Sequence, residues 1–492
     1  MAAETQAGAD GAQTENATLL DQIVNEGHMA HDDSQREHAK DLVGEFVHQV
    51  VDESMQLGAD TVQSIKDRIA EIDAKISAQL NEIMHADEFK ELEASWRGLD
   101  HLVMKTETGE KLKLRLLNLT KGELLKDLTT ASDHDQSQLF KKVYEEEYGT
   151  FGGFPYSVLV TDFELGRHPQ DIELLRRLAA VAAAAHAPLI APASSKLFDM
   201  QDFGELGKPR DLSKIFESSE MIGWRSFRES EDSRYVSLAL PHVLLRLPYG
   251  ADTLPIEEFD FAEDVDGRDP SRYLWGAASW FLAERVTSAF ARYGWTAAIR
   301  GYEGGGAVES LPIHTFTSDD GDLTFTCPTE VSITDRRENE LNKLGFIALV
   351  HRKGTDKAAF FGGQTTQKPK VYDLDEATAN ASLSARLPYI LAASRFAHYL
   401  KVICRDKVGS FLTADDVSRF LNRWINQYVL ARDDAGQDLK AESPLREARV
   451  DVTANLDNPG SYNATVFLRP HFQLEELTTS IRLVAELPPP AA

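Results

Sequence analysis

The sequence predicts a mixed α/β protein, with a helical N-terminal arm, a central α/β body, and C-terminal helices followed by terminal β-strands. Three observations lead to this fold class. Between residues 42 and 103, apolar residues recur every three or four positions, as in amphipathic helices. Short apolar runs then alternate with helical patterns up to residue 361, the order typical of parallel strands in a covered sheet. Near the end of the chain the period becomes two, as expected of strands.

Length and composition predict a globular protein of two or three domains. The chain has 492 residues, of which 42% are hydrophobic and 27% charged, and it contains no apolar run of the ~20 residues that a membrane helix needs. The first ten residues lack the basic region and apolar core of a secretory signal. Only two cysteines are present, Cys327 and Cys404, which fits a reducing compartment. We therefore expect a cytoplasmic protein.

The formal net charge of −27 bears on the partners of the chain. A strongly acidic surface repels nucleic-acid backbones and anionic membranes, so we expect neither as a partner. It favours either solubility alone or a basic partner, and charge does not decide between these two.

We predict three regions: an acidic arm, flexible and partly helical, over residues 1–60, an α/β domain over 61–375, and a C-terminal domain with terminal strands over 376–492. Residues 1–17 are small and polar, so we expect disorder there. Thr18 and Asp21 then have the spacing of a helix capping box. The short helix that follows places four apolar residues on one side: Leu19, Leu20, Ile23 and Val24.

A helix of two turns is marginal in water, so this apolar side needs something to bind. It docks either on the body of this chain or, as a linear peptide, in a groove of a partner. Longer helices are expected around residues 42–51, 62–83 and 89–103, with narrow apolar stripes. Such stripes favour packing against another helix, within the chain or in a partner chain.

The body is predicted element by element from changes of period. A hairpin is expected where two apolar runs flank the turn at residues 354–356. The predicted strands are 112–116, 156–161, 188–191, 235–240, 243–247, 297–299, 346–350 and 358–361, and the predicted helices lie before Tyr148 and at 169–186 and 271–293.

The last quarter of the chain predicts helices and then strands. One helix is expected over residues 375–408, with Pro388 at a start or kink, and another after Thr413, which has Asp416 at capping-box spacing. Strands at a chain end with few local companions are candidates for pairing with the edge of another sheet. The candidate inter-subunit residues on these strands are Val450, Val452, Val466, Leu468, Ile481 and Leu483.

No catalytic, cofactor-binding or metal-binding residues are predicted. The chain contains no HExxH, GxSxG or GxxxxGK[ST] motif. The acidic residues 263–266 lack a distal bidentate glutamate and are expected to form a solvated loop. Arg336 and Arg337 are expected to form exposed ion pairs with neighbouring acids, which contribute little to stability.

Two long phrases, LNKLGFIALVHRKGTDKAAFFGGQTTQKPKVYD (341–373) and RLPYILAASRFAHYLKVICRDKVGSF (386–411), carry a resemblance to a known family. Both closely resemble the large subunit of the contractile sheath of bacterial type VI secretion systems. The likeness extends over nearly the whole chain and is weakest in the first fifteen residues.

The resemblance implies a structural protein rather than an enzyme. Such a subunit would pair with a small sheath subunit and polymerise with copies of itself, from a baseplate, around an inner tube of hexameric rings. Contraction would then drive the tube toward a target cell, and a Clp-type AAA+ ATPase would engage the N-terminal helix, here Leu19, Leu20, Ile23 and Val24, for disassembly.

An alternative remains open: an α/β enzyme with a regulatory N-terminal arm. The alternation of strands and helices favours it, whereas the missing motifs and the apolar stripes at both ends of the chain disfavour it.

Overall fold

The computed structural model describes residues 33–51, 61–257, 259, 261–318, 320–408, 410, 413–432, 434–454, 462–471 and 473. The chain forms two compact units, Met1–Ile83 with Tyr249–Glu263, and Met84–Pro248 with Asp264–Ala492. Helices and strands are both present, which confirms the predicted mixed α/β class.

The first unit contains two long helices, α2 (Asp33–Val51) and α3 (Thr61–Met84). In α3, Glu71 pairs with Arg68 at 2.6 Å and with Lys75 at 2.7 Å, spacings that bring side chains together on one helical face. The predicted apolar stripe stays open to solvent, since Ile69, Ile72 and Ile76 are exposed.

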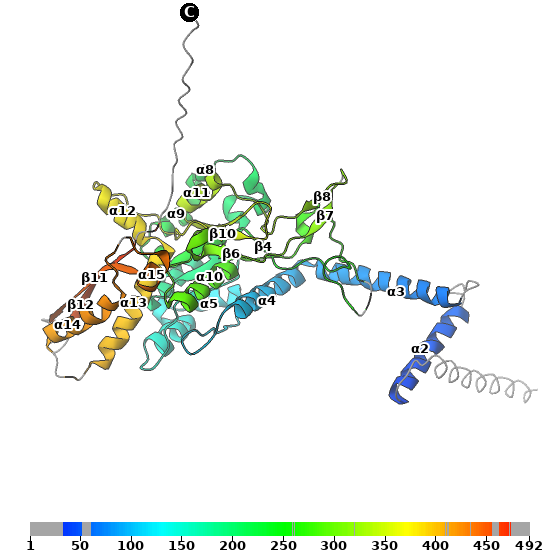
Figure 1. Ribbon diagram of the computed structural model, residues 1–492, viewed down its shortest axis with the longest axis horizontal. Helices are drawn as coiled ribbons and strands as arrows, with labels where there is room; N and C mark the ends of the chain where they lie inside the picture. Colours follow the sequence, from blue (N-terminus) through cyan, green and yellow to red (C-terminus); the bar gives the residue numbers. More distant parts are fainter. Residues whose placement is uncertain are drawn as a thin grey trace, which may run out of the picture. The chain divides into compact units, whose positions relative to one another are not determined.

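A six-stranded sheet forms the centre of the second unit, and two of its strands, β10 and β6, are labelled in Figure 1. The strand order is β1-β2-β3-β9-β10-β6. The first four strands are parallel, and β10 is antiparallel to both of its neighbours. The strands are β1 (Leu159–Val160), β2 (Leu189–Pro192), β3 (Val236–Leu240), β6 (Ala307–Val308), β9 (Phe346–His351) and β10 (Ala358–Phe360).

Both faces of this sheet are buried. On β9, Phe346, Ala348 and Val350 belong to one hydrophobic core, and Ile347 and Leu349 belong to the other. Successive side chains of a strand point to opposite faces, so a strand covered on both faces must be apolar at every position. The continuous apolar runs that predicted β2, β3 and β9 therefore reflect double burial.

Helices cover the two faces. The first core contains α5 (Lys121–Thr130), α7 (Pro169–Ala185), α8 (Leu212–Glu217), α9 (Ile222–Arg228) and α11 (Asp335–Lys343). The second core contains α4 (Asp87–Lys105), α10 (Ala278–Tyr293) and the start of α13 (Leu387–Asp406). Further helical elements of this unit are α6 (Gln138–Phe140) and the π-helices η2 (Lys141–Tyr148) and η8 (Tyr302–Gly306). Two small sheets pair β4 (Val243–Leu244) with β5 (Trp275–Gly276), and β7 (Thr315–Thr317) with β8 (Leu323–Phe325).

The chain that follows the β9–β10 hairpin is a buried polar segment, residues 362–367. Thr366 donates its backbone N–H to Val236 and its hydroxyl to the carbonyl of Ser233, at 2.9 and 2.8 Å. Buried Arg228 donates from Nε to the Thr366 carbonyl at 2.8 Å, and burial lowers the pKa of this arginine to about 10. Because a buried polar group must be hydrogen-bonded, these contacts fix the segment against β3.

A third core forms the C-terminal region. Trp295 stacks on Phe396 of α13, with ring centroids 4.2 Å apart. Around them pack α14 (Ala414–Ile425) and a two-stranded sheet, β11 (Leu445–Ala454) with β12 (Tyr462–Pro470). Helix α13 belongs to the second core at Leu391 and to the third at Phe396, so it joins the two. The short helices α12 (Asp375–Ser384) and α15 (Gln437–Glu442) complete the region.

The strand predicted at 112–116 is not formed. The run between α4 and α5 has no strand partner among the described residues. Leu114 packs against the second core, whereas Leu116 and Leu117 are exposed. Alternating apolar and polar residues form a strand only where the edge of a neighbouring strand supplies backbone hydrogen bonds. The edge strand β1 of the central sheet is only 2 residues long and offers few such hydrogen bonds.

Other predicted elements also differ from the structure, including β1 and β4, which are shorter than the predicted strands 156–161 and 243–247. Helix α10 starts at Ala278 rather than at residue 271, because Trp275 belongs to strand β5 and pairs with Leu244 of β4. No strand forms at 297–299. The helix predicted over 375–408 is divided into α12 and α13, since Pro388 has no N–H with which to continue α12.

A charged cluster lies at the carboxyl end of β3. His242 donates from Nδ1 to Glu330 at 2.5 Å and from Nε2 to Glu164 at 2.7 Å. Burial disfavours the charged imidazolium, but the hydrogen bonds to the two carboxylates outweigh burial and raise the pKa of His242 to about 9.

The raised pKa of His242 predicts a pH-dependent contribution to stability. This contribution is complete below the unfolded pKa of about 6.5 and is lost as pH rises through the folded pKa of about 9. We expect His242→Gln to lower the free energy of unfolding by roughly 1–3 kcal/mol at pH 6, with the difference shrinking by about pH 9.5. Urea unfolding at both pH values measures it. The control is His38→Gln, at an exposed position of α2, which should have little effect. An equal loss at both pH values would refute this account of the cluster.

Close packing of α4 on α10 gives a second prediction. A Cβ atom at Gly98 would overlap the indole ring of Trp280, whereas one at Gly122, in α5, would meet open space. Gly98→Ala should therefore destabilise the fold by about 1–3 kcal/mol. Gly122→Ala should leave stability unchanged or raise it by about 0.4–1 kcal/mol. Thermal unfolding followed by circular dichroism tests the pair, and equal effects of the two substitutions would contradict the α4–α10 contact.

Candidate assembly surfaces

None of the His, Cys, Asp and Glu side chains in the described ranges form a group of three or more able to hold a metal ion. Of the acidic residues 263–266, Asp264 pairs with Arg272, and Asp266 accepts the backbone N–H of Arg268 at 3.0 Å. These carboxylates therefore stabilise local turns.

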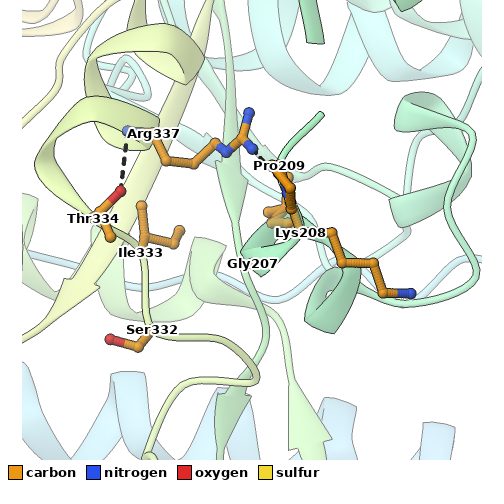
Figure 2. A pocket seen from close by; sticks show the side chains of 8 residues that line it. Gly207, Lys208, Pro209, Ser332, Ile333, Thr334 and Arg337 are labelled. Atoms are coloured by element: carbon orange, nitrogen blue, oxygen red, sulfur yellow. Dashed lines mark hydrogen bonds between the residues drawn. The ribbon is translucent and has the colours of Figure 1, made fainter. Parts of the chain in front are cut away.

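One small cavity, of about 150 Å³, lies between residues 206–209 and 332–337 (Figure 2). The Arg337 side chain at its wall donates to the carbonyls of Lys208 and Arg210, both at 2.8 Å, and pairs with Glu340 at 2.6 Å. The prediction that Arg337 forms only an exposed ion pair is therefore wrong, because its guanidinium ties α11 to residues 208–210, the loop before α8. This arginine stabilises the wall of the cavity and is already bound to protein groups.

No helix in the described part of the chain is long and apolar enough to cross a membrane. The candidate ATPase-binding residues Leu19, Leu20, Ile23 and Val24 lie outside the described residues, as do the predicted inter-subunit residues Ile481 and Leu483. The remaining candidate residues lie on the β11–β12 hairpin.

The hairpin turns one face toward its own chain. Val450 is fully buried in the third core, and Val452, Val466 and Leu468 pack against it half-buried. The structure thus brings these four predicted residues together, but as core side chains under α14. A partner that pairs with this hairpin would meet its backbone edges.

The two edges of the hairpin differ. At β11, Asn422 of α14 accepts the backbone N–H of Val450 at 3.0 Å and donates to the carbonyl of Val450 at 2.7 Å. Ser418 donates to the same carbonyl at 3.1 Å. Side chains of the same subunit therefore close the outer edge of β11 at this position. The sequence gives no signal for this, because the roles of Asn422 and Ser418 depend on where α14 lies.

At the outer edge of β12, no described residue of the chain covers the outward backbone groups. Val466 lies directly opposite Val450, whose backbone groups point away from β12 toward Asn422. Opposed residues of an antiparallel pair direct their backbone groups either both inward or both outward, so those of Val466 also point outward. The alternation places Ala464 and Leu468 in the same orientation. These three residues form an edge suited to receive another strand.

A second exposed surface lies on α4. Four apolar residues of this helix are exposed: Phe89, Leu92, Trp96 and Val103. They belong to the apolar stripe predicted for residues 89–103, which could have packed inside the protein. The neighbouring run 112–117 adds the exposed Leu116 and Leu117. Contiguous exposed apolar residues of this kind mark interaction sites.

Comparison with known proteins matches most of the chain to two family models. Residues 66–367 match the EvpB/VC_A0108 tail sheath N-terminal domain (VipB), and residues 376–487 match the EvpB/VC_A0108 tail sheath gpW/gp25-like domain. Two solved structures are similar at low identity: a chain of the anti-feeding prophage baseplate (TM-score 0.40, 12% identity, 76% of this chain and 84% of that chain) and one of the contracted anti-feeding prophage sheath (TM-score 0.35, 13% identity, 79% and 86%).

A curated relative is much closer in sequence. The chain is 50% identical over 456 residues, 92% of each protein, to the type VI secretion system sheath protein TssC1 of Pseudomonas aeruginosa. This identity and the two family matches confirm the resemblance predicted from residues 341–373 and 386–411. The chain belongs to the VipB family of type VI secretion system tail sheath proteins.

Proposed function

We propose that this chain is the large structural subunit of a contractile sheath, in which the open edge of β12 receives a strand from a neighbouring subunit. The observation that carries the proposal is the asymmetry of the hairpin, in which α14 closes β11 while the outer backbone groups of Ala464, Val466 and Leu468 are directed outward. A helical polymer needs contacts between different surfaces of successive subunits, and one open edge per subunit supplies half of such a contact.

Strand addition suits a sheath that changes length. Main-chain hydrogen bonds between neighbours persist during a rigid-body rotation that breaks side-chain contacts, so linked subunits can slide without separating. On this proposal the sheath assembles in a metastable extended form around an inner tube of hexameric rings. Contraction then releases energy stored during assembly, so the sheath subunit itself uses no nucleotide and performs no catalysis.

The proposed partners follow from the surfaces. The chain pairs with a small sheath subunit in the cytoplasm, and the run 112–117, patterned as a strand but unpaired among the described residues, is a candidate contact. The body ends and the C-terminal domain begins near residue 375. A Clp-type AAA+ ATPase dismantles contracted sheaths by engaging Leu19, Leu20, Ile23 and Val24. A baseplate supplies the starting surface for polymerisation.

Replacing Val466 by proline tests the open edge. Proline removes one outward N–H without removing a hydrogen bond inside the hairpin, so Val466→Pro should keep its fold and lose strand addition. With the small subunit present, we expect sedimentable polymer to fall at least ~10-fold, about 1.4 kcal/mol in association.

Two comparisons keep the edge test specific. Val466→Thr retains the N–H and the β-branched side chain, so it should assemble normally. Circular dichroism confirms that each variant is folded. Wild-type amounts of polymer from Val466→Pro would show that β12 receives no strand.

The ATPase proposal has its own test. Changing Leu20 and Ile23 to aspartate should leave assembly intact but block disassembly, because two charges replace the apolar side of the recognition helix. The matched control places the same two charges on the polar side, as Gln22→Asp with Asn25→Asp. Fluorescence microscopy of labelled sheaths measures recycling. Normal recycling in the Leu20/Ile23 variant would disprove ATPase recognition at this helix.

A further inference from the structure

The outward side of α4 carries a continuous apolar seam. Its members are separated by steps of three, four, three and four residues, and the most exposed are Trp96 at 61% and Leu92 at 56%. The seam consists of Phe89, Leu92, Trp96, Leu99 and Val103; Leu99 is partly buried and also packs against the second core, and the other four are exposed. A 3-4 spacing keeps apolar side chains in line over more than four turns, the pattern that a second helix recognises by interlocking its own side chains.

The opposite side of α4 is already occupied. Gly98 lies against the Trp280 ring, and Leu102 is buried in the second core. Glu93 pairs with Arg246 at 2.7 Å, and Lys90 donates to the Ser271 carbonyl at 2.5 Å. These contacts fix the rotation of the helix, so the seam cannot turn inward.

Charge selects the kind of helix that fits. The exposed residues flanking the seam are Glu88 on one side and Asp100 on the other. Of the bases of α4, Lys90 binds Ser271, Arg97 pairs with Glu93 at 2.6 Å, and exposed Lys105 lies at the C-terminal end of the helix, off the seam. A partner helix therefore gains attraction from lysine or arginine beside its own apolar seam, and acids there would be repelled.

Charge also argues against the two chain ends and a second copy of α4 as occupants. Residues 1–32 contain no lysine or arginine, and residues 474–492 contain one arginine against three glutamates. A second copy of α4 would oppose acids in either orientation, Glu88 against Glu93 when parallel and Glu93 against Asp100 when antiparallel.

We propose that the Phe89–Val103 seam of α4 binds an amphipathic helix of a different polypeptide, with basic residues flanking its apolar seam. The inference rests on the proposed sheath function only for the presence of a second chain. It adds the chemistry by which that chain is recognised, and it identifies a surface separate from the β12 edge.

The test uses the full-length protein and fluorescently labelled 21-residue heptad peptides. One peptide has isoleucine and leucine at the seam and lysine at the flanking positions; a second carries glutamate at those positions. A third is a scrambled form of the lysine peptide, and a fourth is residues 87–105 of this chain. Fluorescence anisotropy at two salt concentrations measures the affinities. We expect the ordered lysine peptide to bind at least tenfold more tightly than each of the others.

Substitutions locate the binding. Leu92→Glu and Trp96→Glu should each weaken binding of the lysine peptide at least tenfold, whereas Ile222→Glu, at an equally exposed apolar residue of α9, should not. Leu92 lies outside the described cores, so its variant should remain folded even where Trp96→Glu is not.

Three results would overturn the proposal: equal binding of the lysine and glutamate peptides, equal binding of the scrambled lysine peptide, or tightest binding of the 87–105 peptide. Unchanged affinity in Leu92→Glu would do so as well. None of these outcomes bears on polymerisation through β12, which the Val466 variants test separately.

Discussion

Burial of both faces of the central sheet is the constraint on which the rest of the structure depends. Each of β2, β3 and β9 sends alternate side chains into two cores, and helices of the same chain cover both. A partner can therefore reach only strand edges, chain ends and the outer sides of helices. The candidate surfaces are all of this kind: the edge of β12, the run 112–117 and the seam of α4.

The C-terminal hairpin shows how one element serves both folding and assembly. Its inner face supplies Val450 and its neighbours to a core that the Trp295–Phe396 stack anchors. Its two edges then have different fates, because Asn422 bonds the outward groups of Val450 and nothing equivalent covers Val466 among the described residues. Because β11 is bonded to its own subunit, a strand from a neighbouring subunit that pairs with β12 would move together with the receiving subunit during contraction.

Much of the body could be predicted because its signals are local. Continuous apolar runs predicted β2, β3 and β9, and the Thr413–Asp416 capping box predicted the start of α14, which the structure confirms. Features that depend on distant neighbours could not be predicted. Residues 112–116 have the period of a strand but no edge to join, and Trp275, assigned to a helix, pairs in β5 instead. The predicted hairpin residues are core side chains, and the open edge emerged only once Asn422 was placed beside Val450.

The central claim is that this chain is built for assembly with a second sheath chain. Negative-stain electron microscopy of the wild-type protein, purified together with the proposed small sheath subunit, tests the claim most directly. The account predicts long hollow tubes with regular helical striations. Discrete particles of uniform size at every salt concentration would contradict it and would favour a free-standing α/β protein with another activity.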